Sequence, residues 1–162
     1  MKKYVFLFFM TMLLFVGCAT QQERVERRER MRKTVAEAVQ SKRMRIEVTS
    51  MFTLRYGSRS VTPDFYLELL GDSIRSYLPY LGQAYLAPMA SPSEGLNFDA
   101  HILTLSESRP KKDFSRLEIG VKTTEDSYLY TIDLYDSGKA YIHVRPQRRD
   151  PIGFDGDLVP QE

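Results

Sequence analysis

The chain has 162 residues, with 23 Lys and Arg against 21 Asp and Glu, one Cys, two His and no Trp. Lys2 and Lys3 account for the whole excess of positive charge, so the part of the chain after residue 17 is formally neutral. General nucleic-acid binders draw much of their affinity from a basic surface, so we expect no nucleic-acid partner. A chain of ~150 residues forms one domain and buries roughly two thirds of its unfolded surface, which suffices for a core without disulfides.

The first 17 residues have the pattern of a secretory signal peptide. Lys2 and Lys3 precede a 13-residue apolar run from Tyr4 to Val16. A helix that crosses a membrane needs ~20 apolar residues, and this run is shorter. We therefore predict that residues 1–17 form a signal peptide, which is removed from the mature protein.

Cys18 is the only cysteine and comes directly after Phe15, Val16 and Gly17. Apolar residues closed by a small residue before a cysteine form a lipobox, at which the thiol is lipidated and the chain is cut before the cysteine. The alternative is a free thiol in a protein cleaved elsewhere, since a single cysteine makes no internal disulfide. Its position favours lipidation of Cys18, and acyl chains whose buried methylenes each contribute ~0.8 kcal/mol anchor a protein stably to a membrane.

Residues 18–43 are predicted to form a charged helical stalk, because they contain no Gly or Pro and their apolar residues recur near helical spacing. The segment 23–33 carries six basic and three acidic residues, in pairs such as Glu26 with Arg30. A basic helix beside a lipid anchor can touch anionic headgroups. The narrow apolar stripe favours the other interpretation, a solvated stalk whose second half docks on the following domain.

From Met44 onward, apolar residues alternate with polar ones, which predicts strands. The alternation is interrupted between Val48 and Phe52, where Ser50 is polar and Met51 is apolar, so we expect a bulge or bend near Ser50 and Met51.

Residues 65–78 are predicted to form a β-hairpin with Gly71 and Asp72 as its two-residue loop. The register pairs residues of matching character: Leu69 with Ile74, Glu68 with Arg75, and Tyr66 with Tyr77. Matched cross-strand pairs of this kind stabilise a sheet, which supports the register.

Two further turns predict a meander that runs to residue 145. Glu125 and Asp126 are expected to form a tight turn, and Asp136–Gly138 a three-residue loop with Gly138 in the left-handed position. These turns place Leu117, Ile119 and Val121 beside Leu134, Ile132 and Tyr130, which in turn face Ala140, Ile142 and Val144. The tail after residue 151 is expected to add one edge strand.

The pattern predicts one domain over residues 44–162, because the connections are short and successive strands then run antiparallel. The fold class is α+β and mainly β. We expect the N-terminal helix to be followed by a curved antiparallel sheet, or an open barrel or sandwich, of about eight strands.

The predicted meander suggests one weak catalytic candidate, made of Glu118, Asp133 and His143. Its register places Glu118 opposite Asp133 and Thr131 opposite His143. Two carboxylates near an imidazole can perform acid and base chemistry, because like charges held close raise one carboxyl pKa. The favoured interpretation is a solvated sheet face on which Lys122, Arg145 and water neutralise the acids.

Tyr77, Tyr80 and Tyr85 form the second candidate, a possible interaction surface. They lie among leucines around Pro79 and Gly82, just before a loop rich in Pro and Ser. Tyrosine combines apolar area with a hydrogen-bonding tip, which suits a binding surface. The favoured interpretation is that these residues close one end of the core.

The sequence predicts no metal site and no cofactor. His101 and His143 are far apart, and no Cys, His or Asp cluster has metal-ligand spacing. No nucleophile elbow, P-loop or dinucleotide-binding glycine motif is present.

The motifs resemble a family of Bacteroidetes lipoproteins known by a domain of unknown function, DUF4251. The resemblance rests on YLPYLGQAYLAP at Tyr77–Pro88, EGLNFDA at Glu94–Ala100 and GFDG at Gly153–Gly156, together with the order of lipoprotein signal, charged helix and strands. It covers nearly the whole mature chain. The resemblance implies location and a single domain, and it implies no activity, catalytic residue or ligand.

We therefore expect a lipoprotein of the cell envelope, anchored at the outer membrane, that acts as a non-enzymatic binding or envelope-assembly module. Its partners would be the membrane itself and an envelope protein or small ligand. The alternative is a small hydrolase that uses Glu118, Asp133 and His143. The stretch Ala19–Glu23 partly resembles a surface-export signal, so both the periplasmic and the outer leaflet stay open.

Overall fold

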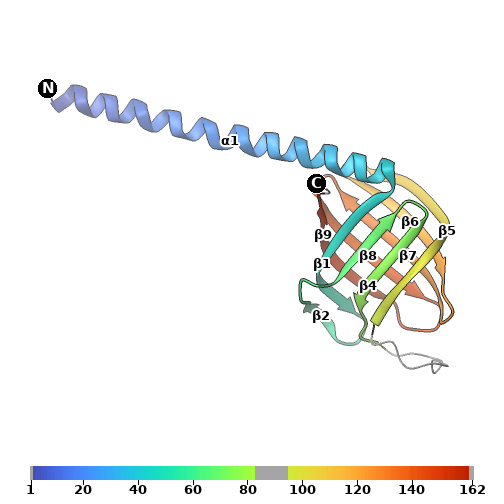
Figure 1. Ribbon diagram of the computed structural model, residues 1–162. Coiled ribbons are helices and arrows are strands. Elements are labelled where there is room, and N and C mark those ends of the chain that lie inside the picture. The colour runs from blue at the N-terminus through green and yellow to red at the C-terminus, as the bar shows by residue number, and fades with distance from the viewer. Residues whose placement is uncertain (1, 83–94, 161–162) are drawn as a thin grey trace.

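In the computed structural model, a long helix leads into an antiparallel sheet that closes into a barrel (Figure 1). The structure describes residues 2–82 and 95–160, with side chains from residue 21 onward. The elements are α1 (Lys2–Ser41), β1 (Arg43–Thr53), β2 (Gly57–Ser60), β3 (Tyr66–Leu70), β4 (Ser73–Pro79), β5 (Gly95–Lys111), β6 (Phe114–Lys122), β7 (Ser127–Tyr135), β8 (Lys139–Pro146) and β9 (Ile152–Val159).

Helix α1 is exposed in its middle and buried near its end. Residues 21–30 are all solvent-exposed, whereas the later apolar residues recur at helical spacing and pack on the barrel core: Met31, Val35, Ala38 and Val39. The helix ends before Lys42, whose φ of 54° is left-handed, and β1 begins at once. Figure 1 shows the helix as a rod that leaves one end of the barrel.

Eight strands form the barrel and one is additional, so the mainly β fold that the sequence predicts is confirmed. The sheet order is β2-β1-β3-β4-β5-β6-β7-β8-β9, and β9 also pairs with β1 and so closes the sheet. The short strand β2 pairs only with the second half of β1, between Ser50 and Thr53. Every pairing between these strands is antiparallel, and consecutive strands are hydrogen-bonded to each other except β2 and β3, which both pair with β1.

Strand β9 is a seam of the barrel and not the edge strand that the sequence suggests. It pairs with β8 on one side and with β1 on the other. The β1 ladder shifts between Val48 and Ser50, which leaves Thr49 as a bulge close to the bend that the sequence predicts. A side chain at Gly156 would collide with the backbone oxygen of Glu47, so glycine permits the close approach of β1 and β9 at this point.

Two predicted hairpins are confirmed and a third has a different register. The β3–β4 pairs match the prediction, and so do the β7–β8 pairs, with Gly138 at φ 84°. The β6–β7 turn has four residues, Thr123–Asp126, so Leu117 lies beside Ile132 and not Leu134. The cause is the Thr123 hydroxyl, which accepts hydrogen bonds from the backbone N–H groups of Glu125 and Asp126.

The barrel interior is filled by side chains. The inward residues of the barrel strands form one continuous cluster, and Tyr130, Phe154 and Met44 are the largest of those that are completely buried. The last turns of α1 join this cluster at one end. The core therefore leaves the outer face of the barrel as the place for contacts with other molecules.

Candidate functional site

The carboxylate and histidine candidate lies on the outer face of the barrel. Glu118 is in β6, Asp133 in β7 and His143 in β8, and their strand neighbours Leu117, Ile132 and Ile142 point inward. The three residues come from adjacent strands because the meander is continuous from β6 to β8. Their detailed placement depends on the register between those strands.

The expected pairing of Glu118 with Asp133 is wrong. The four-residue turn shifts β7 by two residues, so Arg116 lies opposite Asp133 and Thr131 lies opposite Glu118. Arg116 donates two hydrogen bonds to Asp133, of 2.6 Å from Nε and 2.7 Å from Nη2. This bidentate ion pair raises the pKa of the Arg116 guanidinium and occupies both oxygens of Asp133.

His143 is separated from Glu118 by a whole strand. Thr131 lies between them, opposite Glu118 on one side and His143 on the other, as predicted for the second pair. Two strand spacings amount to about 10 Å. Burial lowers the pKa of the His143 imidazole below its ordinary value of 6.5, and Arg145 lowers it further.

The three residues do not converge. The Glu118 carboxylate receives a hydrogen bond of 3.4 Å from Ser106, and Asp133 is held by Arg116. Four hollows on the described surface are all lined by other residues. The geometry that a general acid and base need, with both groups within hydrogen-bond reach of one substrate, is not formed here.

The tyrosine candidate is divided between two places in the barrel. Tyr77 lies in β4 with its side chain outward and 41% exposed. Tyr80 follows β4, packs against the core, and donates a hydrogen bond of 3.1 Å to the backbone oxygen of Asp150. The Arg149 guanidinium lies 5.4 Å from the centre of the Tyr80 ring. Tyr85 lies outside the described residues.

Tyr77 belongs to a cluster that we call the aromatic ladder and define as Arg45, Phe65, Tyr66 and Tyr77, of which Phe65 is partly buried against the core. The Tyr77 ring lies 5.4 Å from Phe65 and 5.7 Å from Tyr66. The Arg45 guanidinium lies 3.7 Å from the centre of the Tyr66 ring, a cation–π contact. The hairpin register predicted the pairing of Tyr66 with Tyr77, but sequence reasoning missed Arg45, because β1 carries no local signal for its β3 partner.

A row of charges lies directly beside the aromatic ladder. Arg75 donates a hydrogen bond of 3.1 Å to Glu68 and another of 3.1 Å to Asp99. The row and the ladder together cover the outer face of β1, β3, β4 and the start of β5. Aromatic residues and arginine are enriched at protein interfaces, whereas glutamate and aspartate are depleted there.

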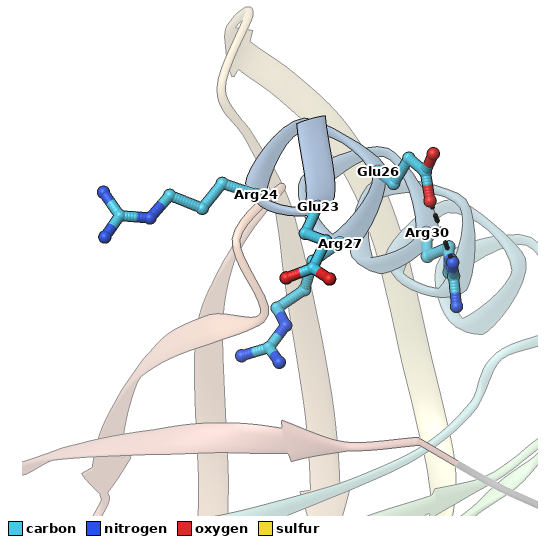
Figure 2. Close-up of a pocket in the computed structure, with 5 residues that line it drawn as sticks. All are labelled: Glu23, Arg24, Glu26, Arg27 and Arg30. Atoms are coloured by element: carbon cyan, nitrogen blue, oxygen red, sulfur yellow. Dashed lines mark hydrogen bonds and ion pairs between the residues drawn. The ribbon is translucent and has the colours of Figure 1, made fainter. Parts of the chain in front are cut away.

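Several hollows open on the described surface. One has a volume of about 570 Å³ and lies beside the exposed part of α1, lined by Glu23, Arg24, Glu26, Arg27 and Arg30 (Figure 2). A second, of about 210 Å³, lies between the end of α1 and strands β1 and β9. The first is lined by one helix, so the described residues do not enclose a ligand there.

The region around Cys18 belongs to α1 by its backbone, and its side chains lie outside the described residues. Within the described part of the chain, we find no helix with both the length and the apolar character of a membrane span. Among the same residues, no three His, Cys, Asp or Glu side chains are grouped so that they could hold a metal ion.

Comparisons with known proteins agree with this architecture. The fold is similar to the crystal structure of a DUF4251 family protein from Bacteroides eggerthii DSM 20697, with a TM-score of 0.62, 14% sequence identity, and coverage of 80% of this chain and 87% of that chain. A comparison with curated proteins gives no match. The family model described as a domain of unknown function, DUF4251, matches residues 26–158. The chain therefore belongs to the DUF4251 family.

Proposed function

We propose that the protein is a lipoprotein of the cell envelope, anchored in the outer membrane through Cys18, that acts as a non-enzymatic binding or assembly module. The observation that carries the proposal is the position of Cys18, the only cysteine, at the end of the apolar run. In this proposal residues 1–17 are removed as a signal peptide, and α1 connects the anchor to the barrel.

The filled core supports a binding role on the outer face. A barrel that holds a small ligand keeps space inside its walls, whereas here the inward side chains of the barrel strands form one packed cluster with the end of α1. The aromatic ladder offers exposed Tyr77, stacked rings and a positioned guanidinium. We assign the contact with an envelope protein to this surface, because tyrosine and arginine contribute most to the affinity of protein interfaces.

Two experiments test the proposal. Cys18→Ser should abolish metabolic labelling with palmitate and release the folded domain from the membrane fraction, since every described core contact lies after residue 30. Thr20→Ser, two residues away, is the matched control and should keep both properties. Finding Cys18→Ser still membrane-bound with its precursor efficiently cleaved would remove the lipoprotein assignment.

The second experiment tests the aromatic ladder by capture of envelope partners on the lipidated protein. Tyr77→Ala should abolish retention of the partner while leaving the melting temperature nearly unchanged. Tyr141→Ala is the control, because Tyr141 is also partly exposed on the outer face, at 37%, but lies in β8 outside the ladder. Equal retention by both variants would exclude the ladder as the binding surface.

A further inference from the structure

The exposed part of α1 carries its charges asymmetrically. At about 100° per residue, Arg24, Arg27 and Arg28 fall within an arc of about 100° of the helix surface. Glu26, Glu29, Arg30 and Lys33 fall on the other side, whereas Glu23 lies about 40° from Arg27, at the edge of the arc. Figure 2 shows Arg24 pointing away from the side on which Glu26 and Arg30 meet.

The arginines of this segment differ in their partners. Arg30 forms an ion pair of 3.2 Å with Glu26, and Arg32 one of 3.5 Å with Asp136 at the barrel end. Arg24, Arg27 and Arg28 form no ion pair with any described residue, and all three are exposed. We call these three residues the cationic face of α1.

The rest of the molecule has the opposite charge. Of the 21 basic and 21 acidic residues that follow residue 17, the segment 23–33 contains six and three, a net charge of +3. Residues 34–162 therefore contain 15 basic and 18 acidic residues, a net charge of −3. A negative surface attracts the helix and repels the barrel, so the charge distribution orients the molecule.

We propose that the cationic face of α1 binds the anionic phospholipid headgroups of the membrane that holds the anchor, and so tilts the helix onto the bilayer surface. This inference rests on the proposed anchoring at Cys18. Arg24 and Arg28 follow Cys18 by six and ten residues, which is about 9 Å and 15 Å along a helix. Extended arginine side chains and a Debye length of about 8 Å bring all three guanidinium groups within reach of the headgroups.

Anionic lipid is the occupant that these observations favour. The arginines are unpaired within the described residues, lie on one side of a helix, and are directly continuous with the proposed anchor. Each arginine near an anionic surface shifts the binding equilibrium on the order of fivefold, so three of them change the orientation of an anchored helix decisively. The docked end of α1, at Met31 and beyond, keeps the barrel fixed to the tilted helix.

The absence of Trp from the chain permits a single reporter of helix position. Val25 is 55% exposed and borders the cationic face, so Val25→Trp introduces one fluorophore beside it. The mature lipidated protein is reconstituted in vesicles of brominated phosphatidylcholine, with or without phosphatidylglycerol. We expect phosphatidylglycerol to increase bromine quenching roughly twofold or more, and about 1 M sodium chloride to remove the increase, because it shortens the Debye length to about 3 Å.

Two double variants that each remove two positive charges test whether the effect of phosphatidylglycerol comes from the cationic face or from net charge alone. In the reporter protein, Arg24→Gln with Arg28→Gln should abolish the increase caused by phosphatidylglycerol. Arg30→Gln with Lys33→Gln, on the other side of the same segment, should preserve it. Leu54, on the barrel, is 74% exposed. A Leu54→Trp reporter should therefore stay unquenched in both kinds of vesicle.

The outcomes distinguish the inference from the proposed function. A protein that floats with both kinds of vesicle, but whose quenching is insensitive to phosphatidylglycerol, is anchored without a lipid-binding helix face and overturns the inference alone. Equal losses in the two double variants also overturn it, because the effect would then be one of net charge. A protein that fails to float with phosphatidylcholine vesicles lacks the anchor, and both proposals fall.

Discussion

The hydroxyl of Tyr130 donates a hydrogen bond of 3.1 Å to the hydroxyl of Ser76 across the inside of the barrel. The two residues lie in β7 and β4, which are not neighbours in the sheet, so the bond joins separate walls. Both side chains are buried, at 0% and 2% exposure. The walls therefore meet through a polar contact in a core that is otherwise almost entirely apolar.

This pair predicts a strong coupling between two substitutions. Tyr130→Phe and Ser76→Ala should each lower the free energy of unfolding by about 1–3 kcal/mol, because each leaves one buried hydroxyl without its partner. The double variant should lose clearly less than the sum, since both hydroxyls are then gone. Urea unfolding measures the cycle, with Tyr141→Phe on the outer face as a control that changes stability by less than about 0.5 kcal/mol. Additive losses would show that the bond contributes nothing.

The same tyrosine predicts a loss of stability at alkaline pH. Burial raises the pKa of Tyr130 above its ordinary value of 10.0, although its bond to Ser76 acts in the opposite direction. The unfolded chain then loses its proton before the folded chain does, so the stabilising contribution is complete below pH 10 and falls as the pH rises further. Chemical unfolding between pH 9 and 11, expected for groups that titrate near 10, should show a steeper decline for the native protein than for Tyr130→Phe. Parallel curves would contradict this assignment.

The contact between Gly138 and Met31 predicts a position-specific cost of adding a side chain. Both Gly138 and Gly71 have positive φ, of 84° and 81°, so alanine at either position costs about 1 kcal/mol in backbone strain. A Cβ at Gly138 would also lie 2.8 Å from the Met31 sulfur, whereas one at Gly71 would meet nothing within 4 Å.

Gly138→Ala should therefore reduce the melting temperature more than Gly71→Ala does. Shortening the helix residue, in Met31→Ala, should remove the difference between the two glycine variants. Thermal unfolding followed by circular dichroism measures all of these proteins. Equal effects at the two glycines would mean that the flexible Met31 side chain moves aside without a measurable cost.

The two described tyrosines of the candidate surface are expected to differ in stability. Tyr80→Ala should lower the free energy of unfolding by about 2–4 kcal/mol, because it removes core packing and the hydrogen bond to Asp150. Tyr77→Ala should cost about 1 kcal/mol or less, since Tyr77 is partly exposed and loses only ring contacts. Urea unfolding measures both. A larger loss for Tyr77 would place the structural role in the aromatic ladder.

The hairpins could be predicted because their signals are local. Gly71 and Gly138 mark turns that only glycine adopts easily, and the matched pairs beside them fix the registers. The β6–β7 register was wrong by two residues, because the turn is held by the Thr123 hydroxyl and not by a glycine. That shift alone separates Asp133 from Glu118, so the predicted catalytic arrangement depended on the weakest turn.

Contacts between distant parts of the chain could not be predicted. The stacking of Arg45 on Tyr66 depends on the pairing of β1 with β3, and no residue in either strand specifies that partner. The contact of Arg116 with Asp133 also depends on a strand register, that between β6 and β7, which the sequence predicted wrongly. The apolar spacing in α1 did predict that the second half of the helix docks on the domain, because amphipathic spacing is itself a local property.

We expect the pairing between β1 and β9 to form last as the barrel folds. Its eight residue pairs join positions between 99 and 114 residues apart, for which the length-dependent cost of loop closure is about 4 kcal/mol. The hairpins close loops of a few residues and form first, leaving an open sheet whose two edges are β1 and β9. Unpaired edges bind other strands readily, so we expect aggregation to compete with this late, long-range step, and a chain that lacks residues 152–159 to keep β1 and β8 as open edges.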